Sequence, residues 1–194
     1  LTQFENAVPA GTLRRGNGIL EENLDTPKVN WSALPVPAWF LFDLSRYQAS
    51  AHRYAKRPNL PVFASRFCPY GCDFCPQSLF NPSQKHHVRP PIEVVKEIKA
   101  LMSDYGIVDI EFYDPTFGIK RAETLELCRL LEPLDIVWSC YTRCDLLDEK
   151  MVGAMANAGC HTILFGVESG NESILAQTQK DLIHDDVERA VALC

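Results

Sequence analysis

The sequence lacks the long apolar runs that cross membranes. No run reaches the roughly 18 residues of a membrane-spanning helix, and the longest apolar stretch, residues 34–44, is interrupted by Pro35, Pro37 and Asp43. The start of the sequence also lacks the basic and apolar regions of a secretory signal peptide. We therefore expect a cytoplasmic protein with no membrane partner.

The sequence is also short of positive charge, with 19 Lys and Arg against 25 Asp and Glu and a formal net charge of −6. Proteins that bind nucleic acid over a broad surface are usually basic. A nucleic-acid partner is therefore not expected, and a small-molecule substrate is. The 46% hydrophobic and 23% charged residues are the proportions of an ordinary globular domain.

Neither end of the sequence has the features of a complete chain. It begins with Leu1 instead of Met, and residues 185–194 form an amphipathic helical pattern that reaches the last residue without a stop signal. We therefore expect a piece of a longer protein.

Three of the eight cysteines fall within eight residues, as Cys68, Cys72 and Cys75 in the spacing C-x3-C-x2-C. An apolar run at residues 60–67 precedes them and a polar stretch at residues 77–89 follows, which predicts a loop leaving the end of a strand. Most iron–sulfur proteins supply four cysteines, whereas catalytic metal sites keep one position open. The spacing therefore favours a four-iron cluster whose fourth iron has no protein ligand.

Two other interpretations of the three cysteines stay open at this point. His86 or His87 could complete a Cys3His zinc site. A disulfide would need an oxidising compartment, and three neighbouring cysteines cannot all pair locally. The other five cysteines lie in apolar, regular segments and are expected to be core thiols; they are Cys128, Cys140, Cys144, Cys160 and Cys194.

Residues 1–59 are predicted to be the tail of an upstream domain. Residues 12–22 have the pattern of a hairpin with its turn at residues 16–18. Residues 31–47 are rich in proline and aromatics and have the character of a linker that ends in a short helix at residues 39–46.

Residues 60–194 alternate between strand and helix patterns. Strands are expected at residues 60–65, 107–113, 136–141 and 162–167, and helices at residues 91–104, 121–131, 148–158, 172–176 and from 185 onward. Four successive βα units predict a parallel sheet. The fold class is therefore α/β, a partial (β/α) TIM-like barrel of about four units preceded by a linker, since a full eight-stranded barrel needs about 250 residues.

Charged side chains follow each of the later strands. Asp114 follows the second strand, Arg143 and Asp145 the third, and Glu168 with Ser169 the fourth. Chemistry in β/α barrels collects at the carboxyl ends of the strands. The alternative is structural: Arg143 pairs with one of the carboxylates, and Asp114 opens an Asp-Pro turn.

Together these motifs resemble the radical S-adenosylmethionine (SAM) enzymes. The resemblance rests on the three cysteines, on Gly166-Val-Glu-Ser-Gly170 with Lys180, on Asp114-Pro-Thr-Phe117 and on Thr142-Arg143-Cys144-Asp145. The set is similar to the branch with cobalamin-dependent members, anaerobic magnesium-protoporphyrin ester cyclases and tRNA methylthiotransferases. Residues 34–39 and 43–47 resemble the linker that follows the cobalamin-binding domain of the cyclases.

The resemblance implies a [4Fe-4S] cluster on Cys68, Cys72 and Cys75, with SAM chelating the open iron. An electron from the cluster then cleaves SAM, and the 5′-deoxyadenosyl radical abstracts a hydrogen atom from the substrate. The protein's part in such chemistry is orientation and the exclusion of competing reactions. A flavodoxin or ferredoxin would supply electrons, and an upstream domain would bind cobalamin.

The resemblance also implies the SAM contacts. Phe74 is expected along the adenine, Glu168 at polar groups of SAM such as the ribose, and Arg143 and Lys180 at the methionine carboxylate, since cations suit a carboxylate. Ser169 and Asp114 are also expected among the cofactor-binding residues. A further position departs from the family pattern: where a paired-glycine element often binds the SAM amino group, this sequence has Asp114.

The expected function is therefore C–H functionalisation such as methyl transfer or cyclisation. A methylthiotransferase acting on tRNA or protein is the alternative within the family, and it would need three further cluster cysteines upstream of Cys68, where this sequence has none. A zinc-binding structural module is the alternative outside it.

Overall fold

The computed structural model describes residues 12–16, 19–23, 34–47, 53–77 and 85–194, which form two compact units, residues 1–35 and 36–194. The first unit contains the predicted hairpin: β1 (Thr12–Gly16) pairs antiparallel with β2 (Ile19–Asn23), and the central turn residues lie outside the described residues. The predicted division between linker and barrel, at residues 59 and 60, stays a prediction.

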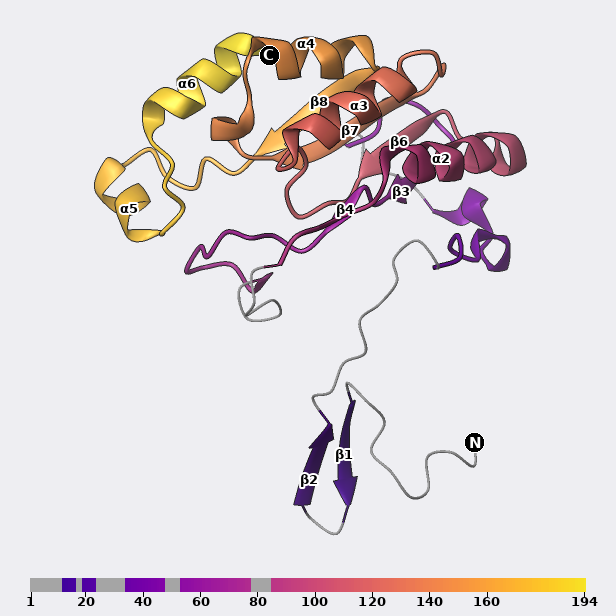
Figure 1. Cartoon of the computed structure of the whole chain (residues 1–194), viewed down its shortest axis with the longest axis horizontal. Coiled ribbons are helices and arrows are strands. Elements are labelled where there is room, and N and C mark those ends of the chain that lie inside the picture. Colours follow the sequence, from indigo (N-terminus) through magenta and orange to yellow (C-terminus); the bar gives the residue numbers. More distant parts are fainter. Residues whose placement is uncertain (1–11, 17–18, 24–33, 48–52, 78–84) are drawn as a thin grey trace. The chain divides into compact units, whose positions relative to one another are not determined.

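The second unit is built on four parallel strands whose order in space is their order in the chain. They are β3 (Asn59–Val62), β6 (Asp109–Phe112), β7 (Val137–Thr142) and β8 (Cys160–Phe165). The helices α2 (Pro91–Tyr105), α3 (Arg121–Leu131) and α4 (Glu149–Asn157) follow the strands and lie along one face of the sheet (Figure 1). This confirms the predicted α/β class and the partial barrel.

Two helices complete the chain, α5 (Glu172–Gln177) and α6 (His184–Leu193). Side-chain caps define several helix starts: Asp148 accepts a hydrogen bond from Met151 N, and Asn171 accepts from Ser173 N and Ile174 N. Within the described ranges, none of the helices is both long and apolar enough to cross a membrane.

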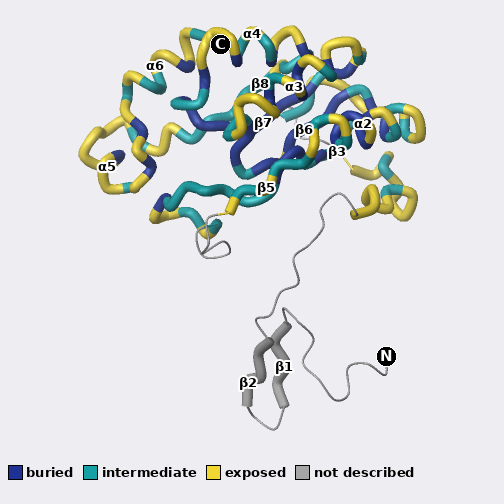
Figure 2. The backbone as a smooth tube through the Cα atoms, in the orientation of Figure 1, coloured by how far each residue is buried: buried dark blue, intermediate teal, exposed yellow. Residues whose placement is uncertain are grey.

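The core lies between the sheet and the helix layer, where Figure 2 shows the buried parts of the chain. Phe112, Phe117 and Trp138 form its aromatic centre, with ring centres 4.8–5.4 Å apart. The indole nitrogen of Trp138 donates to Ala158 O at 2.7 Å, so the buried ring leaves no polar atom unpaired. Gly159 follows at φ +90° against Ile136 O, where a β-carbon would clash.

The segment before β3 is fastened to the beginnings of the other strands. The completely buried Asp109 accepts hydrogen bonds from Ala55 N and Lys56 N at 2.5 and 2.8 Å, and Ser139 Oγ donates to Arg53 O at 2.7 Å. Buried polar groups need such partners. Residues 53–56, which the sequence pattern assigned to the linker, are therefore hydrogen-bonded to the sheet.

Two predicted elements differ in the structure, and one pair of short strands was not predicted. The expected helix at residues 39–46 is two separate 3-10 turns, Trp39–Leu41 and Leu44–Arg46, because Asp43 is extended and caps the second. The first strand ends at Val62 instead of residue 65, because Ala64 N donates to Asp114. Ser65 then starts the short strand β4 (Ser65–Arg66), which pairs antiparallel with β5 (His87–Val88).

The five cysteines outside the loop are not all core thiols. Cys128, Cys140 and Cys144 are buried as expected, and Cys160 is half-buried. Cys194 is exposed, contrary to expectation, because it is the cap residue beyond the last turn of α6.

Candidate functional site

A cavity of ≈560 Å³ lies where the strand-end loops meet. Eight of the nine site residues predicted from the sequence line it, and Ser169 does not. Its hydroxyl instead accepts a hydrogen bond from Asn171 N at 3.0 Å, beside the start of α5. The residues brought together are Cys68, Cys72, Cys75, Phe74, Asp114, Arg143, Glu168 and Lys180.

The cysteine loop, residues 67–77, is tied to the segment before Lys180. Asp73 N donates to Thr178 O at 3.2 Å, and Gln179 Nε2 donates to the Asp73 carboxylate at 3.0 Å. These two bonds join parts of the chain more than 100 residues apart. They place Lys180 beside the cysteines.

The three thiols of the cysteine loop line the cavity. Cys72 is buried, and burial raises its pKa while the nearby Arg143 and Lys180 lower it, as cations do for a thiolate ligand. Across the described residues, no three His, Cys, Asp or Glu side chains are close enough to hold one metal ion. In a cluster each thiolate binds a different iron. Three thiolates on one loop therefore suit three irons of a four-iron cluster.

Arg143 is held on three sides. Its Nε and Nη2 donate to the two Asp145 oxygens at 2.9 and 3.0 Å, Nη2 also donates to Lys180 O at 2.6 Å, and its guanidinium carbon lies 3.9 Å from the centre of the Tyr70 ring. The sequence offered as a structural alternative that Arg143 pairs with a strand-end carboxylate, and Asp145 is that carboxylate. A guanidinium fixed in this way is preorganised to meet an anionic group in the cavity.

Lys180 and Glu168 form an ion pair at the cavity, in which the ammonium is buried and the carboxylate is partly exposed. Lys180 Nζ donates to Glu168 Oε1 at 2.5 Å and to Gly166 O at 2.6 Å. Gly166 has no room for a side chain, because a β-carbon there would meet both the Glu168 carboxylate and Lys180 Nζ. A partly exposed carboxylate beside a buried ammonium offers acceptors and donors together to a polar ligand.

Asp114 faces the protein more than the cavity. Its two carboxylate oxygens accept from Ala64 N at 2.8 Å and from Ser65 Oγ at 2.5 Å, just before the cysteine loop. Burial raises its pKa to about 7, and these hydrogen bonds oppose the rise. This geometry makes Asp114 a positioning residue for the loop.

Backbone strain gathers at this cavity. In the described part of the chain, the non-glycine residues with positive φ are Phe67, Glu168, Gln179 and Asp181, at +50° to +67°. One precedes Cys68, one is a lining residue, and two flank Lys180. Such conformations cost free energy and persist where the surrounding structure holds them, often at functional sites.

Two contributors were not assigned site roles from the sequence, Tyr70 and Gly166. Tyr70 stands inside the cysteine motif, but no pattern distinguishes a stacking ring from any other loop residue. Gly166 belongs to the Gly166-Val-Glu-Ser-Gly170 motif. A glycine directly after a strand often marks a close approach of other groups to the backbone, and this position could have indicated its role.

Two relatives match most of this chain in sequence. An uncharacterized methyltransferase of Pyrococcus horikoshii is 35% identical over 170 residues, which are 85% of this chain and 35% of the relative. The anaerobic magnesium-protoporphyrin IX monomethyl ester cyclase of Synechocystis is 27% identical over 179 residues, 90% of this chain and 34% of the relative. The chain thus spans about a third of the length of these relatives.

Solved structures share the fold. The cobalamin-dependent SAM radical enzyme OxsB matches 99% of this chain and 28% of its own with a TM-score of 0.78 at 20% identity. The radical SAM methyltransferase TsrM of Kitasatospora setae matches 70% of this chain and 28% of its own with a TM-score of 0.62 at 22% identity. The model of the radical SAM superfamily matches residues 62–194, the stretch that carries every lining residue of the cavity, and the chain therefore belongs to that superfamily.

Proposed function

We propose that this chain supplies the cluster and SAM-binding part of a radical SAM enzyme that functionalises a C–H bond. The observation that supports it is the convergence of Cys68, Cys72 and Cys75 with Arg143, Glu168 and Lys180 on one cavity. The residues fit the cofactors: three thiols for the cluster, and fixed cations and a carboxylate for an amino acid and a ribose.

Each residue of the chain has a distinct task in this proposal. Cys68, Cys72 and Cys75 hold the cluster and leave one iron open. The held guanidinium of Arg143 and the ammonium of Lys180 orient the methionine carboxylate, and Glu168 accepts from the ribose hydroxyls. When bound, the cluster supplies the electron that cleaves SAM reductively to the 5′-deoxyadenosyl radical.

Two aromatic residues have positioning tasks. Phe74 is 54% exposed at the cavity wall, so its ring is free to lie along an adenine. Tyr70 lies over the guanidinium of Arg143, 3.9 Å from its carbon to the ring centre, and this cation–π contact helps to hold the guanidinium in place. Ser169 has no assigned contact in this proposal beyond its bond to Asn171 N.

The first test is iron content after anaerobic reconstitution. The wild-type protein should bind about four irons with the broad visible absorbance of a [4Fe-4S] cluster, and Cys72→Ala should lose both, because the cluster keeps only two thiolate ligands. Cys194→Ala, which removes an exposed thiol far along the chain, is the control and should keep the wild-type iron content. One zinc and no iron in the wild-type protein would overturn the proposal.

The finer reaction is methyl transfer or cyclisation, in keeping with the activities named for the relatives. We propose that the complete protein uses cobalamin, because the linker resemblance agrees with OxsB, which is described as cobalamin-dependent. A small-molecule substrate, flavodoxin or ferredoxin as reductant and a cytoplasmic location complete the proposal. Titrating the complete protein with methylcobalamin and following methyl transfer tests it, and an Asp-x-His-x-x-Gly element upstream is the expected sequence signature.

A further inference from the structure

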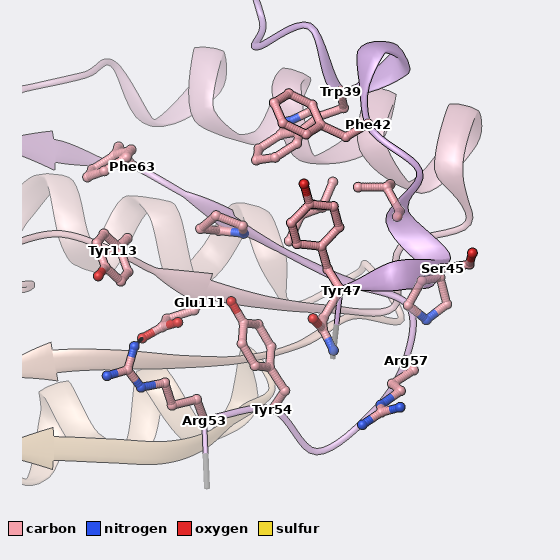
Figure 3. A pocket seen from close by; sticks show the side chains of 15 residues that line it. Trp39, Phe42, Ser45, Tyr47, Arg53, Tyr54, Arg57, Phe63, Glu111 and Tyr113 are labelled. Atoms are coloured by element: carbon pink, nitrogen blue, oxygen red, sulfur yellow. Dashed lines mark ion pairs between the residues drawn. The ribbon is translucent and has the colours of Figure 1, made fainter. Parts of the chain in front are cut away.

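A second cavity, of ≈860 Å³, adjoins the first at Phe63 and Tyr113, which line both. These two rings meet edge to face with centres 5.8 Å apart. The rest of the lining comes from the 3-10 turns at residues 39–47, the segment at residues 53–58, residues 59–61 of β3 and Glu111 of β6 (Figure 3). The volume lies within the range of about 300–1,000 Å³ that small-molecule pockets occupy.

Six of the fifteen residues that line this cavity are aromatic. Trp39, Phe42 and Tyr47 contribute rings from the 3-10 turns, and Tyr54 contributes one from the segment before β3. Neighbouring rings of the turns lie 6.1–6.2 Å apart, Trp39 with Phe42 and Phe42 with Tyr47. Yet Phe42 and Tyr47 are 51% and 65% exposed. Rings that line a hollow without being covered offer stacking surface to a flat apolar molecule.

Glu111 gives this cavity a specific polar group. The side chain is 2% exposed, and its Oε1 has no hydrogen-bond partner among the described residues. Oε1 forms an ion pair with Arg53 Nη1 at 3.5 Å, which is longer than a good N–H···O hydrogen bond (Figure 3). Burial, the charge of Glu111 and a side-chain hydrogen bond with Glu111 all raise the pKa of Tyr54, and Tyr141 also hydrogen-bonds the Glu111 side chain, so two phenols already lie beside this carboxylate while Oε1 keeps no hydrogen-bond partner. A buried carboxylate oxygen without a donor is unfavourable, so a ligand that donates to it would be bound selectively.

We propose that this second cavity is the substrate pocket, and that the substrate is a small molecule with a flat apolar body that donates a hydroxyl or amine hydrogen to Glu111 Oε1. The assignment of the ligand as substrate rests on the proposed function, because it would then lie beside the SAM cavity across Phe63 and Tyr113. The ring pair would set which carbon of the substrate faces that cavity.

The test uses three probes that share a phenyl ring and differ in the polar end, 2-phenylethylamine, 2-phenylethanol and 3-phenylpropionate. Calorimetric titration into the purified protein should show that at least one donor probe binds about tenfold or more tightly than the carboxylate, which at neutral pH has no hydrogen to donate. In Glu111→Met, which keeps the side-chain length but removes the acceptor, that preference should fall to about twofold or less.

Two further variants make the result decisive. Glu126→Met removes an exposed carboxylate on α3 and should leave the preference unchanged. Phe42→Ser removes a half-exposed wall ring and should weaken every bound probe about threefold to tenfold without changing the preference among them. If Glu111→Met does not fold, Phe42→Ser still tests the pocket, because unchanged binding in it would overturn the proposal.

The remaining outcomes separate the pocket from the proposed function. Equal affinity for donor and acceptor probes, or no binding because another part of the longer protein fills the cavity, would overturn the pocket. Iron content and SAM binding are measured on the same preparations. If both are normal while selectivity is absent, only the pocket fails; if the wild-type protein binds no iron but selects donor probes through Glu111, the proposed function fails instead.

Discussion

At the scale of single residues, the charged side chains that line the cavity are also hydrogen-bonded to other parts of the protein. Arg143 is fixed by Asp145, by Lys180 O and by the Tyr70 ring, while Lys180 is fixed by Glu168 and Gly166 O. Fixing these charges before a ligand arrives lowers the entropy lost on binding. Small changes at this cavity should therefore affect SAM binding more than folding.

Gly166→Ala tests this directly. The added β-carbon would meet Lys180 Nζ at 2.6 Å and the Glu168 carboxylate, so the pair must move apart. We expect SAM affinity to fall about tenfold or more, since a charge-assisted hydrogen bond contributes about 1.5–3 kcal/mol. Equilibrium dialysis on reconstituted protein measures it. Gly170→Ala, which meets nothing within 4 Å, is the control and should bind SAM like the wild type.

Asp114 gives a prediction in pH. Burial raises its folded pKa to about 7 from an ordinary 3.8, so the folded state binds the extra proton between these values. Stability should therefore be highest below pH 4 as far as this group is concerned, and should fall as pH rises to about 7, by at most about 4 kcal/mol. Urea unfolding at pH 5 and pH 7.5 measures this: the free energy of unfolding should fall less between the two pH values in Asp114→Asn than in the wild type. An identical pH dependence in both proteins would contradict the assignment.

At the scale of elements, the turns between helix and strand set where each strand end lies. Gly159 joins α4 to β8, and its φ of +90° brings the backbone against Ile136 O. That contact fixes the start of β8 beside β7, where Trp138 N donates to Gly159 O at 3.0 Å. The far end of β8 then delivers Gly166 and Glu168 to the cavity.

Gly159→Ala should lower the free energy of unfolding by about 2 kcal/mol or more, because it combines an unfavourable φ with a backbone clash. Gly153→Ala, inside α4 with nothing within 4 Å, should instead raise it by about 0.5–1 kcal/mol. Urea denaturation of the two variants and the wild type measures both changes in the free energy of unfolding, which should have opposite signs. Equal effects would show that the α4–β8 turn is not constrained as described.

At the scale of the whole second unit, four loops from distant parts of the sequence share one cavity. The cysteine loop is bonded to residues 178 and 179, and Cys68 Sγ lies 3.5 Å from Thr116 Oγ1. Loops joined in this way should respond to a ligand together.

Hydrogen–deuterium exchange can show this response. Cluster reconstitution with SAM should slow exchange in residues 67–77 and 166–181 together and leave α2 unchanged, because none of the residues of α2 lines the cavity. Removing iron with a chelator should reverse the change. Protection of the cysteine loop alone would show that the two segments are independent.

The sequence by itself determined the order of the βα units, because strand and helix periodicities are local properties of the chain, and α3 begins and ends at the predicted residues. It also identified the three cysteines as candidate cluster ligands, because their spacing within eight residues is itself a property of the local sequence. Only the tertiary structure decided that Arg143 pairs with Asp145, that Asp114 serves the loop, and that Glu111 lies buried without a hydrogen bond to its Oε1. Such partners are set by which strands become neighbours and how their side chains pack, and no local pattern encodes that.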